Sequence, residues 1–147
     1  MATHRCRSPY SLVNMANGNV LTTVPVVSWQ SLGSPIQFCL YHNTLGSEPG
    51  QPSLGEKWTH SYGRRLVHHQ GSDTYVLFTD EGGSLLFSPE VAGSGIYRAA
   101  PGIHLVLRTP TPPEAVTTVT YKNQDQDIFD QTGRLIAVVD ASGNVTS

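Results

Sequence analysis

The sequence predicts an all-β protein, built from antiparallel β-hairpins that join into an open, repeat-type sheet. Two observations predict this fold class. Short runs with apolar residues at alternate positions recur along the 147 residues, separated by turns rich in Gly, Pro, Asn and Asp. No segment shows three turns of the 3.6-residue apolar periodicity that indicates an amphipathic helix.

The first elements predicted are a lead-in and two long strands. Residues 1–16 predict an irregular lead-in that ends at the turn signal Asn17-Gly18. Asn19–Trp29 is rich in β-branched residues, and Pro25 within it favours an edge position or a bulge. A second strand is expected at Ile36–His42. Its side chains alternate between two faces, with Ile36, Phe38 and Leu40 opposite Gln37, Cys39 and Tyr41.

The middle of the chain predicts a loop, a strand and a hairpin. Residues 43–56 carry Gly and Pro repeatedly and predict an exposed loop. A strand is expected from Trp58 to about His69. The segments Thr74–Thr79 and Ser84–Ser88 predict a hairpin around Asp80–Gly83.

The last third of the chain predicts four shorter strands. Three of them are expected at Ile96–Ala99, Ile103–Arg108 and Val116–Lys122, and the fourth at Arg134–Val139. Residues 109–114 must form a loop, because their three prolines cannot donate to a sheet ladder.

One turn unit, Asp-x-x-Gly, occurs three times between strand-like runs, at Asp80–Gly83, Asp130–Gly133 and Asp140–Gly143. An Asp at the first turn position accepts hydrogen bonds from following backbone amides. A Gly three residues later adopts a positive φ without strain and closes the hairpin. Because the last two copies are ten residues apart, we expect hairpins laid side by side in one continuing sheet.

The end of the chain resembles the Rhs or YD-repeat unit. The positions that carry this resemblance are Phe129, Asp130, Gly133, Arg134, Leu135, Asp140, Gly143, Asn144 and Thr146. The Tyr-Asp pair that follows in that unit has no counterpart before Ser147, and residues 123–127 lack the usual Gly.

An upstream segment resembles the β-rich domain that precedes the repeats in many Rhs proteins. The most specific matching residues are Trp58, Thr59, His60, Ser61, Tyr62, Arg65 and Leu66. Two further matching stretches are Ala16–Val20 and Phe38–Asn43.

The resemblance implies a domain division and a structural role. Residues 17–122 would form an Rhs-type N-terminal β domain, and residues 123–147 an incomplete first repeat. Rhs proteins wind a long antiparallel sheet into a hollow shell, which in many members encloses a C-terminal toxin. We therefore expect a non-enzymatic shell segment without a cofactor. Its partners would be the remaining repeats or the cargo domain of a parent protein, a type often secreted or placed on the cell surface.

Composition excludes several other classes of partner. Charged residues make up 14% of the chain, against about 25% in an average domain. The net charge of -2 gives no reason to expect nucleic acid. No run of 18 apolar residues exists, so we expect no membrane span. The basic N-terminus is not followed by an apolar segment, which predicts no signal peptide in this chain and leaves the compartment open.

Histidines offer no clear metal site. His68 and His69 are adjacent, so on a strand they point to opposite faces. His60 shares one strand face with Trp58 and Tyr62, which favours a packed, hydrogen-bonded ring over a metal ligand.

Three acidic residues near the tail do not fit a calcium-binding loop. Asp125, Asp127 and Asp130 fail the EF-hand spacing and lack its Gly, so a hairpin turn at 122–126 with its carboxylates in solvent is favoured. Arg64 and Arg65, which flank a strand, are expected to be solvated edge charges.

The cysteines leave two alternatives. A Cys6–Cys39 disulfide would close a loop, but free buried thiols are favoured because nothing else marks an oxidising compartment.

Catalysis and ligand binding have little support in the sequence. No nucleophile motif occurs, so no enzyme is predicted. The aromatic residues favour a role as filling of a half-buried sheet. The alternative is a secreted or surface β-domain that binds carbohydrate through exposed aromatics among Trp29, Tyr41, Trp58, Tyr62, Tyr75 and Tyr121.

Overall fold

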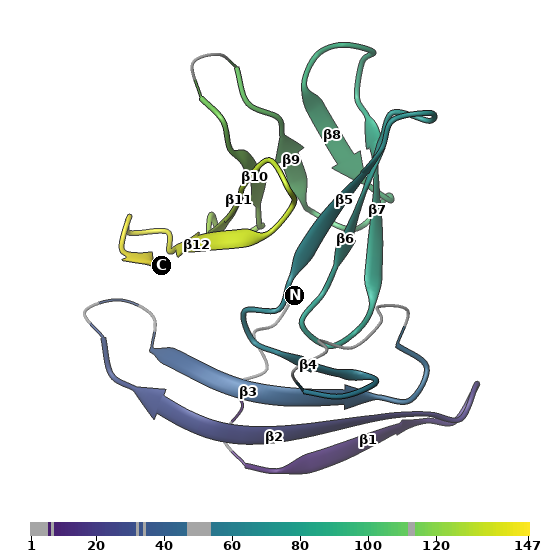
Figure 1. Cartoon of the computed structure of the whole chain (residues 1–147), viewed down its shortest axis with the longest axis vertical. Coiled ribbons are helices and arrows are strands. Elements are labelled where there is room, and N and C mark those ends of the chain that lie inside the picture. The colour runs from purple at the N-terminus through teal and green to yellow at the C-terminus, as the bar shows by residue number, and fades with distance from the viewer. Residues whose placement is uncertain (1–5, 7, 32, 34, 47–53, 112–113) are drawn as a thin grey trace. The chain divides into compact units, whose positions relative to one another are not determined.

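The computed structural model of the chain describes residues 6, 8–31, 33, 35–46, 54–111 and 114–147 (Figure 1). All thirteen elements of this part are β-strands, and their arrangement in antiparallel sheets confirms the predicted fold class. None of the described residues forms a helix long and apolar enough to cross a membrane. The chain divides into two compact units. One comprises residues 1–63 and 78–84, and the other comprises residues 64–77 and 85–147.

The first unit contains a four-stranded antiparallel sheet. Its strands, in spatial order, are β1 (Tyr10–Asn14), β2 (Asn19–Trp29), β3 (Ile36–Asn43) and β4 (Trp58–His60). The strand β1 lies within the predicted irregular lead-in, where Tyr10 pairs with Thr23 of β2. The register shifts between Pro25 and Val27, which is the bulge expected from a proline inside a strand.

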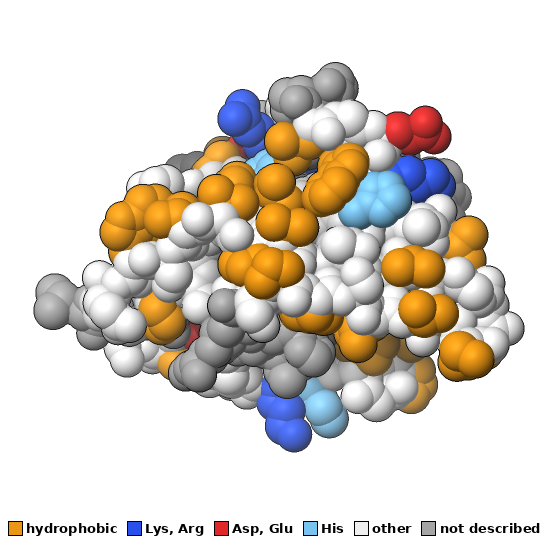
Figure 2. Space-filling model, turned by 90° about the horizontal axis from the view of Figure 1, so that it is seen from below, with side chains coloured by type: hydrophobic (Ala, Val, Ile, Leu, Met, Phe, Trp, Pro, Cys, Tyr) orange, Lys and Arg blue, Asp and Glu red, His pale blue; other side chains and the backbone are white. Residues whose placement is uncertain are grey.

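The two faces of this sheet differ in burial. Cys39 and Tyr41 of β3 lie on the buried face, together with Thr23 and Thr59 from the neighbouring strands. The other face is only half-buried. Large hydrophobic side chains of this unit are also exposed, as the spread of orange across one face in Figure 2 illustrates. The most exposed are Leu12, Val13, Met15, Val26, Trp29 and Leu45.

A nine-stranded antiparallel sheet follows, and its spatial order is the order of the chain. Successive hairpins therefore add one strand after another to the same sheet. The strands are β5 (Arg65–His69), β6 (Thr74–Phe78), β7 (Ser84–Pro89), β8 (Ile96–Ala99), β9 (Val106–Arg108), β10 (Thr117–Thr120), β11 (Gln126–Phe129), β12 (Leu135–Val139) and β13 (Val145–Thr146).

The core of the second unit lies along one face of this sheet. Burying each large apolar side chain there contributes about 1.5–3 kcal/mol. The core residues are Leu66, Leu77, Phe87, Tyr97, Leu105, Leu107, Val119 and Phe129.

Two predicted segments differ from the structure, in addition to the lead-in, which contains β1. The expected strand over residues 58–69 is two strands, β4 and β5, which belong to different sheets. The chain turns between them, where the Gly63 amide donates to the His60 carbonyl at 2.7 Å. The segment Ile103–Arg108 is extended in a ladder only from Val106. Of the predicted loop at 43–56, residues 47–53 lie outside the described part.

Candidate functional site

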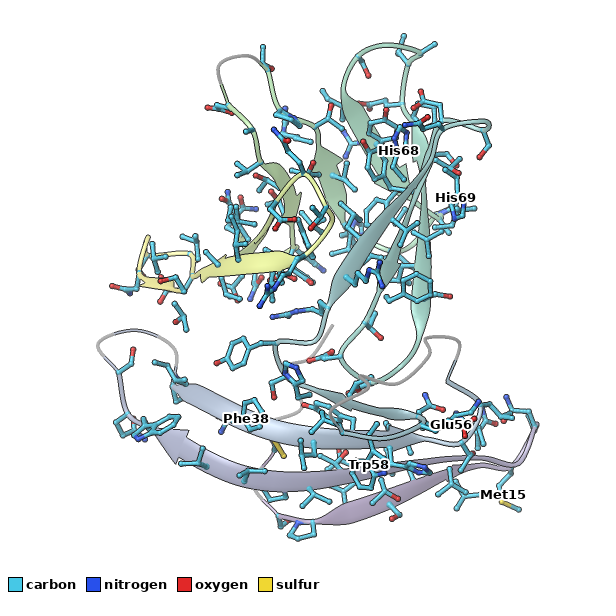
Figure 3. The ribbon with its side chains drawn as sticks, in the orientation of Figure 1. Met15, Phe38, Glu56, Trp58, His68 and His69 are labelled. Atoms are coloured by element: carbon cyan, nitrogen blue, oxygen red, sulfur yellow. A yellow bond between two sulfur atoms is a disulfide. The ribbon has the colours of Figure 1, made fainter. Side chains whose placement is uncertain are left out.

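The Trp58–Tyr62 motif lies in β4, at one edge of the four-stranded sheet, and in the turn that follows. Its aromatic rings contact those of Phe38 and His42 on the half-buried face. Figure 3 labels Phe38 and Trp58. The centroids of Trp58 and His42 are 5.0 Å apart, and His60 stacks on Phe38 at 5.4 Å. Tyr62 adds a further stacked ring, 6.4 Å from Phe38. The motif therefore packs ring on ring along β3.

His60 is a neutral, packed side chain. Burial lowers its pKa, and the nearby Asp80 carboxylate opposes this effect only in part. The Tyr62 amide donates to Nδ1 of the ring at 3.3 Å, which requires that this nitrogen carry no proton. The described residues contain no group of three or more His, Cys, Asp or Glu side chains placed to hold a metal ion.

This burial predicts a pH-dependent stability. The unfolded His60 has the higher pKa, about 6.5, so the unfolded chain binds the proton first as the pH falls. The contribution of neutral His60 to the free energy of unfolding is therefore complete above about pH 6.5 and decreases below it. We expect the urea midpoint to fall between about pH 7.5 and about pH 5.5, and His60→Gln to reduce this fall. The exposed His69→Gln is the control, and an unchanged pH slope in His60→Gln would contradict the prediction.

Polar groups of β3 and β4 lie on the face of the sheet that carries Cys39 and Tyr41. The Thr59 hydroxyl donates to the carbonyl of Asp80. Asn43 in β3 donates from Nδ2 to the carbonyl of Glu81 at 2.7 Å. Both bonds hold the tip of the β6–β7 hairpin, residues 78–84, within the first unit.

A disulfide joins Cys6 to Cys39, so the expectation of free thiols is wrong. Both cysteines are buried, and Tyr41 packs against them. The Ser61 amide donates to the Cys39 carbonyl at 3.1 Å, and the Ser61 hydroxyl accepts from the Cys39 amide at 2.9 Å. The serine of the motif therefore positions the strand that carries the disulfide.

Loss of this disulfide is expected to destabilise the first unit strongly. The cysteines are 33 residues apart in sequence, and opening a loop of this length costs about 3–4 kcal/mol of unfolding free energy. Cys6→Ala/Cys39→Ala should therefore show a lower denaturant midpoint. Reductant should lower the midpoint of the wild-type chain to a similar extent and leave that of the variant unchanged. A wild-type midpoint that survives complete reduction would contradict this.

The first tail turn has the predicted geometry. Asp130 Oδ1 accepts from the Thr132 amide at 2.8 Å, the Thr132 hydroxyl at 2.6 Å and the Arg134 amide at 3.0 Å. The hydroxyl bond is the largest cause of the lowered pKa of Asp130. Gly133 has a φ of 80°.

The second tail turn repeats this arrangement. Asp140 Oδ1 accepts from the amides of Ser142 and Asn144, each at 2.9 Å. Asn144 Nδ2 adds a bond to Asp140 Oδ2 at 2.8 Å. Gly143 has a φ of 84°. Two turns of one design therefore flank β12.

The third predicted copy of the turn is shifted by one residue. The turn opens at Thr79, whose hydroxyl accepts from the Gly83 amide at 3.1 Å. The glycine with positive φ is Gly82, at 78°, rather than Gly83. Thr79 therefore has the role that Asp130 has in the tail, and Asp80 is the residue after it.

The hairpin turn expected at residues 122–126 is a further copy of this unit, formed without glycine. The Tyr121 amide donates to the Asp125 carbonyl and the Gln124 amide to the Tyr121 carbonyl, both at 2.9 Å. Gln124 occupies the glycine position with a φ of 71°. The backbone hydrogen bonds therefore repeat those of the Asp130–Gly133 turn, although the sequence has no Asp-x-x-Gly here.

The two parts of the family resemblance meet at a seam formed by Arg65, Leu66, Gly133 and Arg134. The Leu66 amide donates to the Gly133 carbonyl at 2.8 Å, and Arg65 pairs with Arg134 in an antiparallel bridge. A methyl group added at Gly133 would overlap the carbonyl oxygen of Leu66 and lie 2.9 Å from its carbonyl carbon. Gly133 therefore supplies both the positive φ of its turn and the close approach to β5.

A buried ion pair lies on the core face of the same sheet. The Asp127 side chain is 1% exposed, and its Oδ2 lies 3.3 Å from Arg64 Nε. The Tyr121 hydroxyl donates to the same oxygen at 2.6 Å. Arg64 is thus not a solvated edge charge. Asp127 is withdrawn from solvent, and Asp125 in the preceding turn is half-buried.

The remaining motif residues do not join the seam. Leu135 packs against the core cluster. Trp58 to Tyr62 belong to the other compact unit. The Asp140–Asn144 turn precedes the last strand, and a methyl group added at Gly143 would meet no atom within 4 Å.

These features define an all-β protein of successive hairpins. A repeated turn connects its strands, and a backbone seam joins β5 to the turn after β11. Residues 11–87, just over half of the chain, match the family described as Domain of unknown function (DUF6531), and the chain belongs to that family. The match runs from β1 into β7 and includes the Trp58–Leu66 motif. A comparison with curated proteins gave no match.

Proposed function

We propose that this chain is a non-enzymatic segment of an Rhs/YD-repeat shell, a wall that encloses a C-terminal toxin or other cargo. The observation that carries the proposal is the nine-stranded sheet whose spatial order is its chain order. In such a sheet each hairpin needs contacts only with its neighbours, so a wall extends by adding hairpins. The two matching tail turns on either side of β12 would each connect one added strand to the next.

The proposed partners are further repeats and the cargo domain. The strand β13 forms the last rung of the sheet and pairs with β12 through Val145 and Thr146. A following hairpin would pair with its other edge. The free edge of a sheet is a ready template for another strand.

A duplication can test growth by hairpins. Gln126 and Val145 both pair with Val139, from opposite sides. A second copy of residues 126–144 inserted after Asn144 therefore keeps the register and the faces. Asp127 is replaced by Val in the copy, because its Arg64 partner would be absent there. We expect slow hydrogen exchange in the added hairpin and a higher melting temperature.

The matched control removes one residue. A copy of residues 127–144 shifts the register by one, which moves every added side chain to the wrong face. This insert should exchange rapidly and add no stability. Equal exchange in both inserts would overturn the wall proposal.

A second candidate, carbohydrate binding, rests on exposed aromatic residues. Trp29 is 55% exposed at the end of β2, and Trp58 is half-buried beside His42. A glycan array with the chain and its Trp29→Ala and Trp58→Ala variants tests it. Binding that is lost in a folded variant would support this candidate, and no binding by the unaltered chain would exclude it for the glycans on the array.

A further inference from the structure

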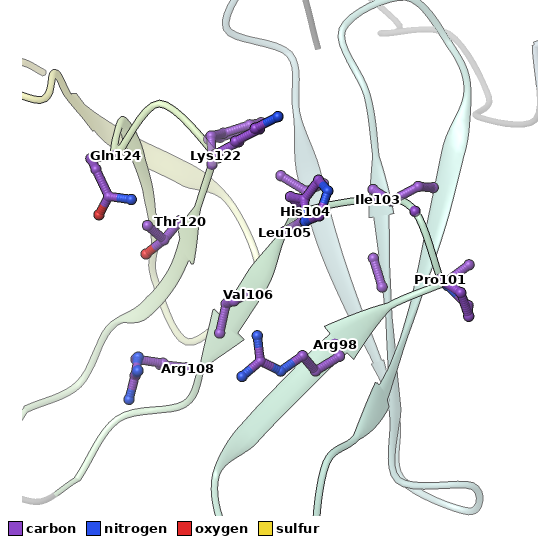
Figure 4. Close-up of a pocket in the computed structure, with 14 residues that line it drawn as sticks. Arg98, Pro101, Ile103, His104, Leu105, Val106, Arg108, Thr120, Lys122 and Gln124 are labelled. Atoms are coloured by element: carbon purple, nitrogen blue, oxygen red, sulfur yellow. The ribbon is translucent and has the colours of Figure 1, made fainter.

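A groove of about 530 Å³ is lined by residues of β8, β9 and β10 and of the loops beside them (Figure 4). Residues 101–105 and the turn at 121–124 contribute to its lining. The strand register places Arg98, Val106 and Thr120 in one row across β8, β9 and β10. The core face carries their chain neighbours Tyr97, Leu107 and Val119.

Positive charge is concentrated in this groove. Arg98, Arg108 and Lys122 are three of the nine Lys and Arg residues of the chain, and His104 adds an imidazole ring. All lining residues belong to the described part of the chain, and no Asp or Glu is among them. The chain as a whole carries a charge of -2. The groove therefore has a charge opposite to that of the whole molecule.

The register brings the two guanidinium groups to neighbouring positions. Arg98 pairs with Val106, and Arg108 follows two residues later on the same face. Such diagonal neighbours stand about 7–8 Å apart, within reach of long side chains. In Figure 4 the Arg98 side chain extends toward Val106.

One arginine is held in place by an acidic residue outside the groove lining. Glu90 Oε1 lies 3.1 Å from both Nε and Nη2 of Arg98. A guanidinium has five N–H donors, so this contact leaves others for a ligand. The Thr120 hydroxyl and the Gln124 amide supply neutral donors in the lining.

We propose that this groove binds a tetrahedral oxyanion, the phosphate or sulfate group of a small ligand. Cationic and neutral donors from three strands and a turn line the groove, and no Asp or Glu belongs to that lining. Arginine in particular matches the geometry of such oxygens with paired N–H groups. This binding role is independent of the proposed wall function.

The test titrates the full chain with pyrophosphate and with sulfate. Citrate serves as the comparison, because its carboxylate groups are planar and not tetrahedral. Two-dimensional amide NMR spectra report where each anion binds. We expect pyrophosphate or sulfate to shift groove amides, with affinity that falls as salt rises. Arg108→Gln should weaken binding by about tenfold, the effect of one charge-assisted hydrogen bond. The control Arg134→Gln removes the same charge from an exposed position outside the groove.

Each result decides the proposal. Groove shifts that weaken in Arg108→Gln but not in Arg134→Gln would support it, and the tighter of the two tetrahedral anions would identify the group. No groove shifts, equal weakening in both variants, or tighter binding of citrate would overturn it. Unchanged spectra of both variants outside their substitution sites establish that the fold is retained.

Discussion

Gly133→Ala is expected to lower the free energy of unfolding by about 4 kcal/mol, among the larger effects of a single substitution. Two causes add. An alanine at a φ of 80° is strained by about 1–2 kcal/mol. The new methyl group also overlaps the Leu66 carbonyl, so the seam between β5 and the β11–β12 turn must open. Denaturant unfolding measures the loss, and hydrogen exchange at the Leu66 amide reports the open seam.

Gly143→Ala is the matched control. Gly143 has nearly the same φ, 84°, and the same turn, but a methyl group there meets open space. We expect a cost of only about 1–2 kcal/mol from the backbone strain. Equal losses in the two variants would show that the seam contributes nothing to stability.

Asp127→Asn is expected to cost about 3–5 kcal/mol, because it removes the negative charge that lies 3.3 Å from Arg64 Nε on the buried face of the sheet. The amide also matches the Tyr121 hydroxyl and the guanidinium less well than a carboxylate does. Thermal or denaturant unfolding measures this cost. An amide substitution retains the shape of the side chain, so packing changes little.

Two further variants define the source of this effect. Glu90→Gln removes a carboxylate from an exposed pair with Arg98 and should cost less than about 1 kcal/mol. The double variant Arg64→Met/Asp127→Leu removes both buried charges and should recover much of the stability lost in Asp127→Asn. A double variant less stable than Asp127→Asn would show that the loss of the buried negative charge is not the cause.

Local pattern was sufficient to predict most strands. The bounds of β2 and β8 agree with the prediction, because alternation and flanking turn residues mark both ends. The break at Gly63 could not be predicted, since Trp58 to His69 alternates well enough to suggest one strand. Only the partner strands, β3 for β4 and β6 for β5, show that the two halves belong to different sheets.

The candidate site was predictable where its contacts are local. Asp130 and Asp140 bind amides two and four residues away, so their spacing in sequence carries the information. The disulfide and the Arg64–Asp127 pair join residues far apart in the chain. The alternation of apolar residues does not indicate which distant residues come into contact. The sequence therefore suggested free thiols and a solvated arginine.

The seam also limits how chains of this design can vary in length. It joins β5 to the turn after β11, so the number of strands between these two points is fixed by the contact between Leu66 and Gly133. A hairpin inserted between them would push Gly133 away from Leu66 and break the join. A hairpin added after β12 would leave the join intact. Related chains that lengthen or shorten by whole hairpins should therefore do so beyond Gly133, while the number of strands before it stays constant.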